Sequence, residues 1–163
     1  MKKIILVRHG KSSWDSPFLS DHDRPLAERG LRDAPRMAKR LRKKGLIPEV
    51  ILTSTAKRAL HTAQLTQEEL DISPKCIHPI PELYHSSPNT ILKFLRMQND
   101  NHQLIFVVGH NPGMNDLIED LGGNLDNLPT SGQFGFKFKT DSWKDIDAKN
   151  AEVWFVDYPK KKA

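Results

Sequence analysis

Two arginines and two histidines lie at or just beyond the ends of apolar runs in the sequence. Arg8 and His9 follow "IILV" and precede Gly10, while His110 follows "LIFVVG". Arg58 comes shortly after a third apolar run, "VILT". Such cations gathered at one point would repel one another unless an anion lay between them, and arginine matches the oxygens of a phosphoryl group in bidentate fashion. These residue types predict a site for a phosphate-like anion.

The elements that would position these residues alternate along the chain. Apolar runs predict strands, and amphipathic patterns between them predict helices, one of them over about residues 26–44 with a kink or a restart near Asp33 caused by Pro35. This alternation predicts an α/β fold: a single domain of three layers, with a mostly parallel central sheet and helices on both faces. Ligands of such sheets bind beyond the carboxyl ends of the strands, where the residues named above are expected to converge.

Size and composition limit the other possibilities. The 163 residues suit one domain, expected over residues 1–158 and followed by a basic tail, residues 159–163, that is expected to be disordered. No segment has the roughly 18 to 20 apolar residues that span a bilayer, so no membrane partner is expected. The single cysteine, Cys76, allows no internal disulfide, which favours a reducing cytoplasm as the location.

The net charge of +5 permits a nucleic-acid partner, but the pattern of the charges argues against one. In the basic segment 36–45, Met37 and Leu41 recur at helical spacing with basic residues between them. This pattern favours a solvated helix face. No aromatic residues alternate with the basic ones, so we expect no nucleic-acid partner.

Several segments together resemble the histidine phosphatase superfamily, which includes phosphoglycerate mutases and acid phosphatases. They are "LVRHG", "TSTAKRALHT", "PEL" and "VVGHNP". The segments "RHGKSSW", "DRPLAERG" and "GHNPGMNDL" are most similar to its small bacterial branch, the phosphohistidine phosphatases of the SixA type. The resemblance extends from Ile4 to about Gly132 and implies a phosphoglycerate mutase-like fold. Ala27 departs from the pattern, since the family often has a threonine that caps the helix there.

The resemblance implies that His9 is the nucleophile and forms a phosphohistidine intermediate. A neutral imidazole suits this role at pH 7 if one ring nitrogen holds the proton and the other stays free, and the turn at Gly10 could bring a carbonyl that fixes this tautomer. Arg8 and Arg58 would bind the nonbridging oxygens, and His110 would neutralise charge on the transferring group. No metal and no other cofactor is expected.

The general acid is the open part of this interpretation. Glu82 in "PEL" is the best candidate, because a loop after a strand could bring it over the phosphate, although an ordinary loop acid or an ion-pair partner fits equally well. Asp23 is a weaker alternative. If no acid is present, phosphohistidine becomes the favoured substrate, because imidazole is a far better leaving group than an alkoxide.

Four further residues are candidates for substrate binding, each with a structural alternative. Arg24 could contact the anion or pair with Asp21 or Asp23. Ser54 could bind a phosphate oxygen or cap the following helix, and the cap is favoured. The remaining two are Asn111, a possible cap of the last helix, and Ser131, which could close the pocket or lie in an ordinary turn.

Two aromatic residues, Trp14 and Phe18, lie in the loop after His9. They could shape a surface for a protein substrate or anchor the loop, and the anchor is slightly favoured. The leading hypothesis is a metal-independent phosphatase of phosphohistidine in proteins. The alternatives are a phosphatase of small phosphate esters and a non-catalytic module that binds phosphate.

Overall fold

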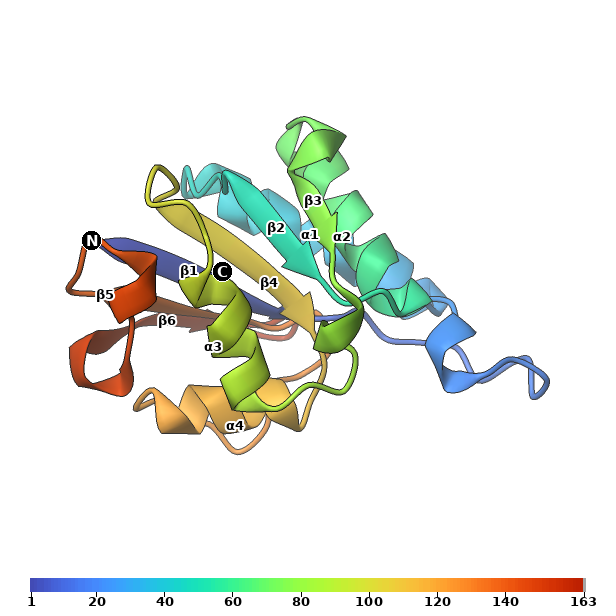
Figure 1. Cartoon of the computed structure of the whole chain (residues 1–163). Helices are drawn as coiled ribbons and strands as arrows, with labels where there is room; N and C mark the ends of the chain where they lie inside the picture. Colours follow the sequence, from blue (N-terminus) through green and yellow to red (C-terminus); the bar gives the residue numbers. More distant parts are fainter. Residues whose placement is uncertain (163) are drawn as a thin grey trace.

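Six strands form one mixed sheet in the computed structural model, which describes residues 1–162 (Figure 1). In spatial order they run β3-β2-β4-β1-β5-β6. The first four in that order are parallel, whereas β5 is antiparallel to both of its neighbours. The strand bounds are β1 (Lys2–Arg8), β2 (Val50–Thr53), β3 (Ile77–Pro79), β4 (Leu104–Gly109), β5 (Gln133–Phe138) and β6 (Ala151–Asp157).

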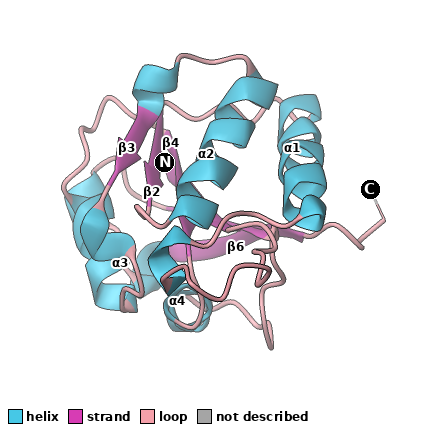
Figure 2. Cartoon of the chain, turned by 90° about the vertical axis from the view of Figure 1, so that its right-hand side faces the viewer, coloured by secondary structure: helices cyan, strands magenta, loops and turns pink. Residues whose placement is uncertain are grey.

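Helices cover both faces of the sheet, as Figures 1 and 2 show. Helices α1 (Glu28–Lys43) and α2 (Lys57–Leu70) pack together on one face. Helices α3 (Pro88–Arg96) and α4 (Gly113–Asp120) pack together on the other. The predicted three-layer α/β fold with a mostly parallel sheet is therefore confirmed. None of the described helices is long and apolar enough to cross a membrane.

The core consists of two layers because successive side chains of a strand point to opposite faces. On β4, Ile105 and Val107 pack in the layer shared with α3 and α4, while Phe106 and Val108 pack in the layer shared with α1. All six residues of β4 are buried. This explains why its sequence is continuously apolar rather than alternating.

Helix α1 runs continuously through Pro35, so the chain does not restart its helix near Asp33, which was one of the two predicted alternatives. Proline removes one backbone donor, which costs one hydrogen bond within the helix. Residues on both sides of it, Ala34 and Met37, are buried in the protein interior. Burial of this face stabilises the helix across the missing bond.

The tail that the sequence predicts to be disordered, residues 159–163, is described as far as residue 162. The carbonyl of Pro159 accepts a hydrogen bond from Arg40 Nη2 at 3.2 Å. The Lys161 backbone N–H donates to the Tyr158 carbonyl at 3.0 Å, and its Nζ donates to the Val156 carbonyl at 2.7 Å. These contacts hold residues 159–161 next to α1 and β6, and Ala163 lies outside the described residues.

Candidate active site

Three segments distant in the sequence meet at the carboxyl edge of the sheet. Because β1 and β4 are parallel and in register, with Arg8 opposite Gly109, their next residues His9 and His110 are neighbours. The two imidazole ring centroids are 5.1 Å apart. Arg58 comes from the first turn of α2, which follows β2. All four predicted residues border one cavity of about 260 Å³.

His9 is buried and held in one tautomer. Its Nδ1 lies 2.7 Å from the Gly10 carbonyl oxygen, so Nδ1 carries the proton and Nε2 keeps its lone pair. The Gly10 N–H in turn donates to Thr62 Oγ1 at 2.9 Å, and that hydroxyl donates to the Arg58 carbonyl at 2.7 Å. Thr62 therefore ties the turn after His9 to the helix that carries Arg58.

The surroundings of His9 keep its ring neutral. Burial is the main cause that lowers the pKa of His9 to about 4; the Gly10 carbonyl partly opposes it, and the nearby Arg58 and Arg8 contribute to the lowering. A protonated ring would lose hydration and would face positive charges. At neutral pH the lone pair on Nε2 is available to attack an electrophile.

His110 is held between a hydroxyl and a guanidinium. Its Nδ1 lies 3.5 Å from Arg58 Nη2, which can only donate, so Nδ1 accepts there and Nε2 carries the proton. Nε2 then donates to Ser54 Oγ at 2.7 Å. Burial lowers the pKa of His110 to about 3, with smaller effects from His9 and Arg58.

The arginines differ in how far the protein satisfies them. Arg8 donates from Nη1 to the Leu128 carbonyl at 2.9 Å, while its Nε is buried without a partner among the described residues. Burial, and then the neighbouring Arg58, lower the pKa of Arg8. Arg24 borders the same cavity and uses Nε on the Ser13 carbonyl at 3.1 Å. Arg8 therefore retains a donor that no protein acceptor meets.

Asp21 supplies the carboxylate that faces these cations, a feature that the sequence analysis considered only as a partner of Arg24. Its Oδ1 accepts from Arg24 Nη1 at 2.9 Å, and its Oδ2 accepts from Arg58 Nη2 at 3.0 Å. The Tyr84 hydroxyl donates to Oδ2 at 2.5 Å. This hydrogen bond, followed by those from Arg58 and Arg24, holds the pKa of Asp21 well below its usual range. Asp21 is thus an anion at neutral pH and unsuited to donate a proton.

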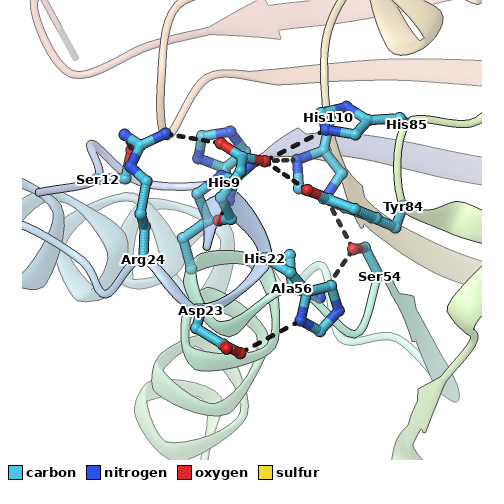
Figure 3. A network of polar contacts seen from close by, with 12 residues as sticks. His9, Ser12, His22, Asp23, Arg24, Ser54, Ala56, Tyr84, His85 and His110 are labelled. Carbon is cyan, nitrogen blue, oxygen red and sulfur yellow. Dashed lines mark hydrogen bonds and ion pairs between the residues drawn. The ribbon is translucent and has the colours of Figure 1, made fainter. Parts of the chain in front are cut away.

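His85 is a further residue at the cavity, one that the sequence analysis did not single out. It borders the cavity, its Nε2 lies 3.3 Å from Asp21 Oδ2, and its ring centroid is 5.5 Å from that of His110. Figure 3 shows Tyr84, His85 and His110 together above Ser54. Nothing in the motif "LYHSSP" marks His85 as different from an ordinary loop histidine.

The structure does not bring Glu82 to the cavity. Glu82 lies in the short 3-10 turn Pro81–Leu83, it is exposed, and it does not border the cavity. The same turn buries Leu83 in the core and directs Tyr84 toward Asp21, so the residues after Glu82 reach the site in its place. Asp23, the weaker candidate, contacts Ser20 and His22 and does not border the cavity.

The four predicted binding residues fall into two groups. Arg24 and Asn111 border the cavity, and Arg24 also forms the expected pair with Asp21. Ser54 and Ser131 are buried and do not border it.

Three of these residues, Ser54, Asn111 and Ser131, each support a neighbouring segment of the chain. Ser54 Oγ accepts from the Ala56 N–H at 3.1 Å, at the start of α2, and supports His110. Asn111 Oδ1 accepts from the Asn115 N–H at 3.1 Å in the first turn of α4. The Ser131 N–H donates to the Arg8 and His9 carbonyls, both at 3.1 Å.

The two aromatic residues after His9 do not anchor their loop. Phe18 is 96% exposed and Trp14 is 71% exposed. The Trp14 ring lies over the Arg24 guanidinium, with 3.3 Å from Cζ to the ring centroid, and borders the cavity. A residue that anchors a loop buries its side chain against the rest of the protein. The slightly favoured expectation that Trp14 and Phe18 anchor this loop was therefore wrong.

The arrangement can bind a phosphoryl anion and present an unprotonated imidazole nitrogen to its phosphorus. Seven cationic or imidazole side chains border a cavity of about 260 Å³, just below the volume of sites for drug-sized ligands. Within residues 1–162, no group of three or more His, Cys, Asp or Glu side chains is arranged to hold a metal ion.

Comparisons with known proteins agree with this geometry. The sequence family described as the histidine phosphatase superfamily (branch 1) matches residues 4–84. An uncharacterized chloroplastic protein of Arabidopsis thaliana is 31% identical over 155 residues, covering 90% of this chain and 71% of that protein. A 2,3-bisphosphoglycerate-dependent phosphoglycerate mutase of Streptomyces avermitilis is 44% identical over 71 residues, covering 42% of this chain but 28% of the mutase.

Among solved structures, one from Agrobacterium tumefaciens, described as a candidate phosphohistidine phosphatase SixA, is similar over nearly the whole chain. It has a TM-score of 0.82 and 29% sequence identity, and the match covers 97% of this chain and 98% of that one. The fold is therefore shared over nearly the full length of both chains.

Proposed function

The chain belongs to the histidine phosphatase superfamily, and from this membership we propose that it is a phosphatase acting through a phosphohistidine at His9, with phosphohistidine in a protein as its substrate. The observation that carries the proposal is the neutral His9 ring, whose Nδ1 is tied to the Gly10 carbonyl while Nε2 keeps its lone pair. This ring borders a cavity that it shares with Arg8, Arg58 and His110.

The reaction has two steps. In the first, His9 Nε2 forms a bond to phosphorus as the bond between phosphorus and the substrate imidazole nitrogen breaks, and the released imidazole takes a proton from water. In the second, a water molecule attacks phosphorus, the bond to Nε2 breaks, and inorganic phosphate leaves. The net reaction consumes one water and yields a free histidine and phosphate, with His9 restored.

The remaining side chains of the site stabilise the negative charge of the phosphoryl group. Arg8 and Arg58 bind nonbridging oxygens of the phosphoryl group, and Arg8 Nε is a buried donor without a partner in residues 1–162. The incoming dianion raises the pKa of His110, because an opposite charge nearby favours the protonated ring. Nδ1 can then carry a proton and donate to a phosphoryl oxygen. Positioning and charge stabilisation of this kind supply most of the catalysis in phosphoryl transfer.

Two features favour phosphohistidine over a phosphate ester. An alkoxide leaving group needs a proton, but Glu82 lies away from the cavity and Asp21 is strongly held in its charged form. The cavity is small, and the exposed Trp14 and Phe18 lie on the loop beside it. A protein that presents a phosphorylated side chain fits such a site better than a large small-molecule ligand does.

Hydrolysis of small phosphate esters is the second candidate function. It is favoured by the match to a phosphoglycerate mutase over 71 residues. His85 borders the cavity and could supply the proton that an ester requires. A non-catalytic phosphate-binding module is the third candidate.

The first experiment separates an enzyme from a binding module. The wild-type protein is mixed with a generic aryl phosphate, and released phenol is measured with and without a metal chelator. We expect turnover that the chelator does not reduce and that His9→Ala abolishes. Alkaline denaturation during turnover of a radiolabelled substrate should leave label on the wild type and none on His9→Ala. Binding of phosphate without phenol release would refute the enzymatic proposal.

The second experiment identifies the substrate class. Phosphate release is compared between a phosphohistidine peptide and a panel of sugar and glycerate phosphates, for the wild type and Glu82→Gln. We expect the peptide to be hydrolysed faster, and Glu82→Gln to keep the wild-type rate because its side chain is remote from the cavity. Faster turnover of the esters would overturn the substrate assignment, and its loss in Glu82→Gln would contradict the remote position of Glu82.

A further inference from the structure

A second, larger hollow adjoins the catalytic cavity. It has a volume of about 720 Å³ and lies between α1, the Pro129–Thr130 segment and the C-terminal residues 158–162. Thr130 borders both hollows, and Arg29 Nη2 donates to its Oγ1 at 3.4 Å. Figure 2 shows the C-terminal end of the chain beside α1. We call this hollow the basic groove, lined by Arg29, Arg32, Arg36, Arg40 and the lysines 160–162.

The groove carries a large local excess of positive charge. Seven basic side chains line it, and the carboxylates paired with them are Asp33 and Asp157. The excess of five positive charges equals the net charge of the whole protein, +5. The rest of the molecule is therefore neutral on balance, so the groove, like the catalytic cavity, is a place where an anionic group would be attracted.

The arginines of the groove have two different roles. Arg40 is occupied: it donates from Nη1 to Asp157 Oδ1 at 2.9 Å and to the Tyr158 carbonyl at 3.0 Å, which holds the C-terminal wall against α1. Arg32 and Arg36 share the single buried carboxylate of Asp33, with Nε and Nη1 at 3.3 and 4.0 Å. Their side chains are 67% and 53% exposed, so most of their donors remain open to a ligand.

The shape of the charged row favours an extended ligand. From Arg29 to Arg40, α1 advances about 16 Å, which is about the length of five residues of extended peptide. A compact phosphate would need converging, buried donors such as those around His9, whereas these cations are exposed and spread along the helix. Tyr158 is the one aromatic residue that lines the groove, which gives the bases of a nucleic acid little to stack on.

We propose that the basic groove binds an acidic segment of the protein substrate, next to the phosphorylated residue in the catalytic cavity. The groove joins the cavity at Thr130, so a chain whose side chain enters the cavity can continue along α1. The proposal rests on the proposed function in that it takes the substrate to be a protein. Exposed ion pairs are individually weak, so recognition depends on several of them and weakens with salt.

Binding is measured first, without any turnover. Fluorescence anisotropy follows a labelled hexaglutamate peptide, a labelled hexaglutamine peptide and a labelled DNA oligonucleotide of six phosphates at low salt. Arg32→Gln/Arg36→Gln is the test variant, and Lys39→Gln/Lys93→Gln removes the same charge from exposed positions outside the groove. We expect hexaglutamate alone to bind the wild type and the control variant, with binding about tenfold weaker in the test variant.

Turnover then tests the link to the substrate. Phosphohistidine peptides flanked by glutamates or by glutamines are compared, with an aryl phosphate as a reference. We expect the wild type to prefer the glutamate peptide through a lower KM, and the test variant to lose this preference while its aryl phosphate activity is unchanged. Equal binding of hexaglutamate by wild type and test variant, tighter binding of the oligonucleotide, or equal KM values for the two peptides would overturn the groove proposal. Failure of all peptide turnover with intact hexaglutamate binding would instead refute the proposed substrate class.

Discussion

The state of His9 depends on contacts made by residues that never touch the substrate. Its lone pair is positioned through the Gly10 carbonyl, and the Gly10 N–H is fixed by Thr62, which also bonds the Arg58 carbonyl. One hydroxyl on α2 therefore sets the relative placement of the nucleophile and of an anion-binding arginine. The sequence analysis assigned Thr62 no role at the site.

Replacement of this hydroxyl should impair catalysis more than folding. Thr62→Val keeps the shape of the side chain but leaves the buried Gly10 N–H without a partner, which costs about 1–3 kcal/mol of unfolding free energy. We expect kcat for the aryl phosphate to fall by about tenfold or more, because small displacements at a reacting centre have large effects on rate. Urea unfolding and steady-state kinetics measure the two effects.

Thr66→Val is the matched control for this prediction. Thr66 is buried one turn further along α2, and its Oγ1 donates to the Thr62 carbonyl at 2.8 Å, but it makes no contact with Gly10. The control should keep wild-type kcat with a modest loss of stability. Equal loss of activity in both variants would show that α2 packing, rather than the bond to Gly10, supports the site.

At the scale of elements, one glycine allows α1 to pack closely against the turn after His9. A Cβ built at Gly30 would lie 2.4 Å from the Lys11 carbonyl oxygen and 3.0 Å from the Lys11 nitrogen. Both are backbone atoms, which cannot move aside without displacing the turn that follows His9. Gly30 is therefore required by the close packing of two elements.

Gly30→Ala should push α1 and this turn apart. We expect the unfolding free energy to fall by about 1–3 kcal/mol, as for overpacked cores, together with a clear loss of phosphatase activity. Gly45→Ala is the control at the other end of α1, where φ is +72° and a Cβ would meet nothing within 4 Å. It should cost about 1 kcal/mol of left-handed strain at unchanged activity. A fully active Gly30→Ala would contradict the proposed coupling.

At the scale of the whole molecule, the sequence predicts the sheet edge better than the loops around it. Arg8, His9 and His110 could be placed together because parallel strands end at a common edge, and this depends on regular backbone geometry alone. Glu82 and His85 could not be assigned, since they lie in irregular turns whose side-chain directions depend on tertiary contacts. The burial of Leu83 and the bond from Tyr84 to Asp21 decide which of them reaches the cavity.

The site should also make the stability of the whole protein depend on pH. The pKa values of His9 and His110 are about 4 and about 3 in the folded state, below the ordinary value of 6.5. Above pH 6.5 both rings are mostly neutral in the folded and the unfolded chain. Their burial then does not reduce the unfolding free energy through loss of a proton. As the pH falls below 6.5, the unfolded chain takes up protons that the folded site excludes, so the unfolding free energy decreases.

Between pH 7 and pH 5 this loss is on the order of 2 kcal/mol for each histidine. Urea unfolding in a buffer without phosphate measures it for the wild type, for His9→Gln/His110→Gln and for the control His78→Gln, whose histidine is exposed on β3. Between these two pH values, the unfolding free energy of the wild type and of the control should fall by several kcal/mol more than that of the double variant. Asp21 does not interfere, because its lowered pKa affects stability only below about pH 4, the ordinary value for a carboxyl group. Equal losses in all three proteins would show that the two rings are not held neutral by the fold.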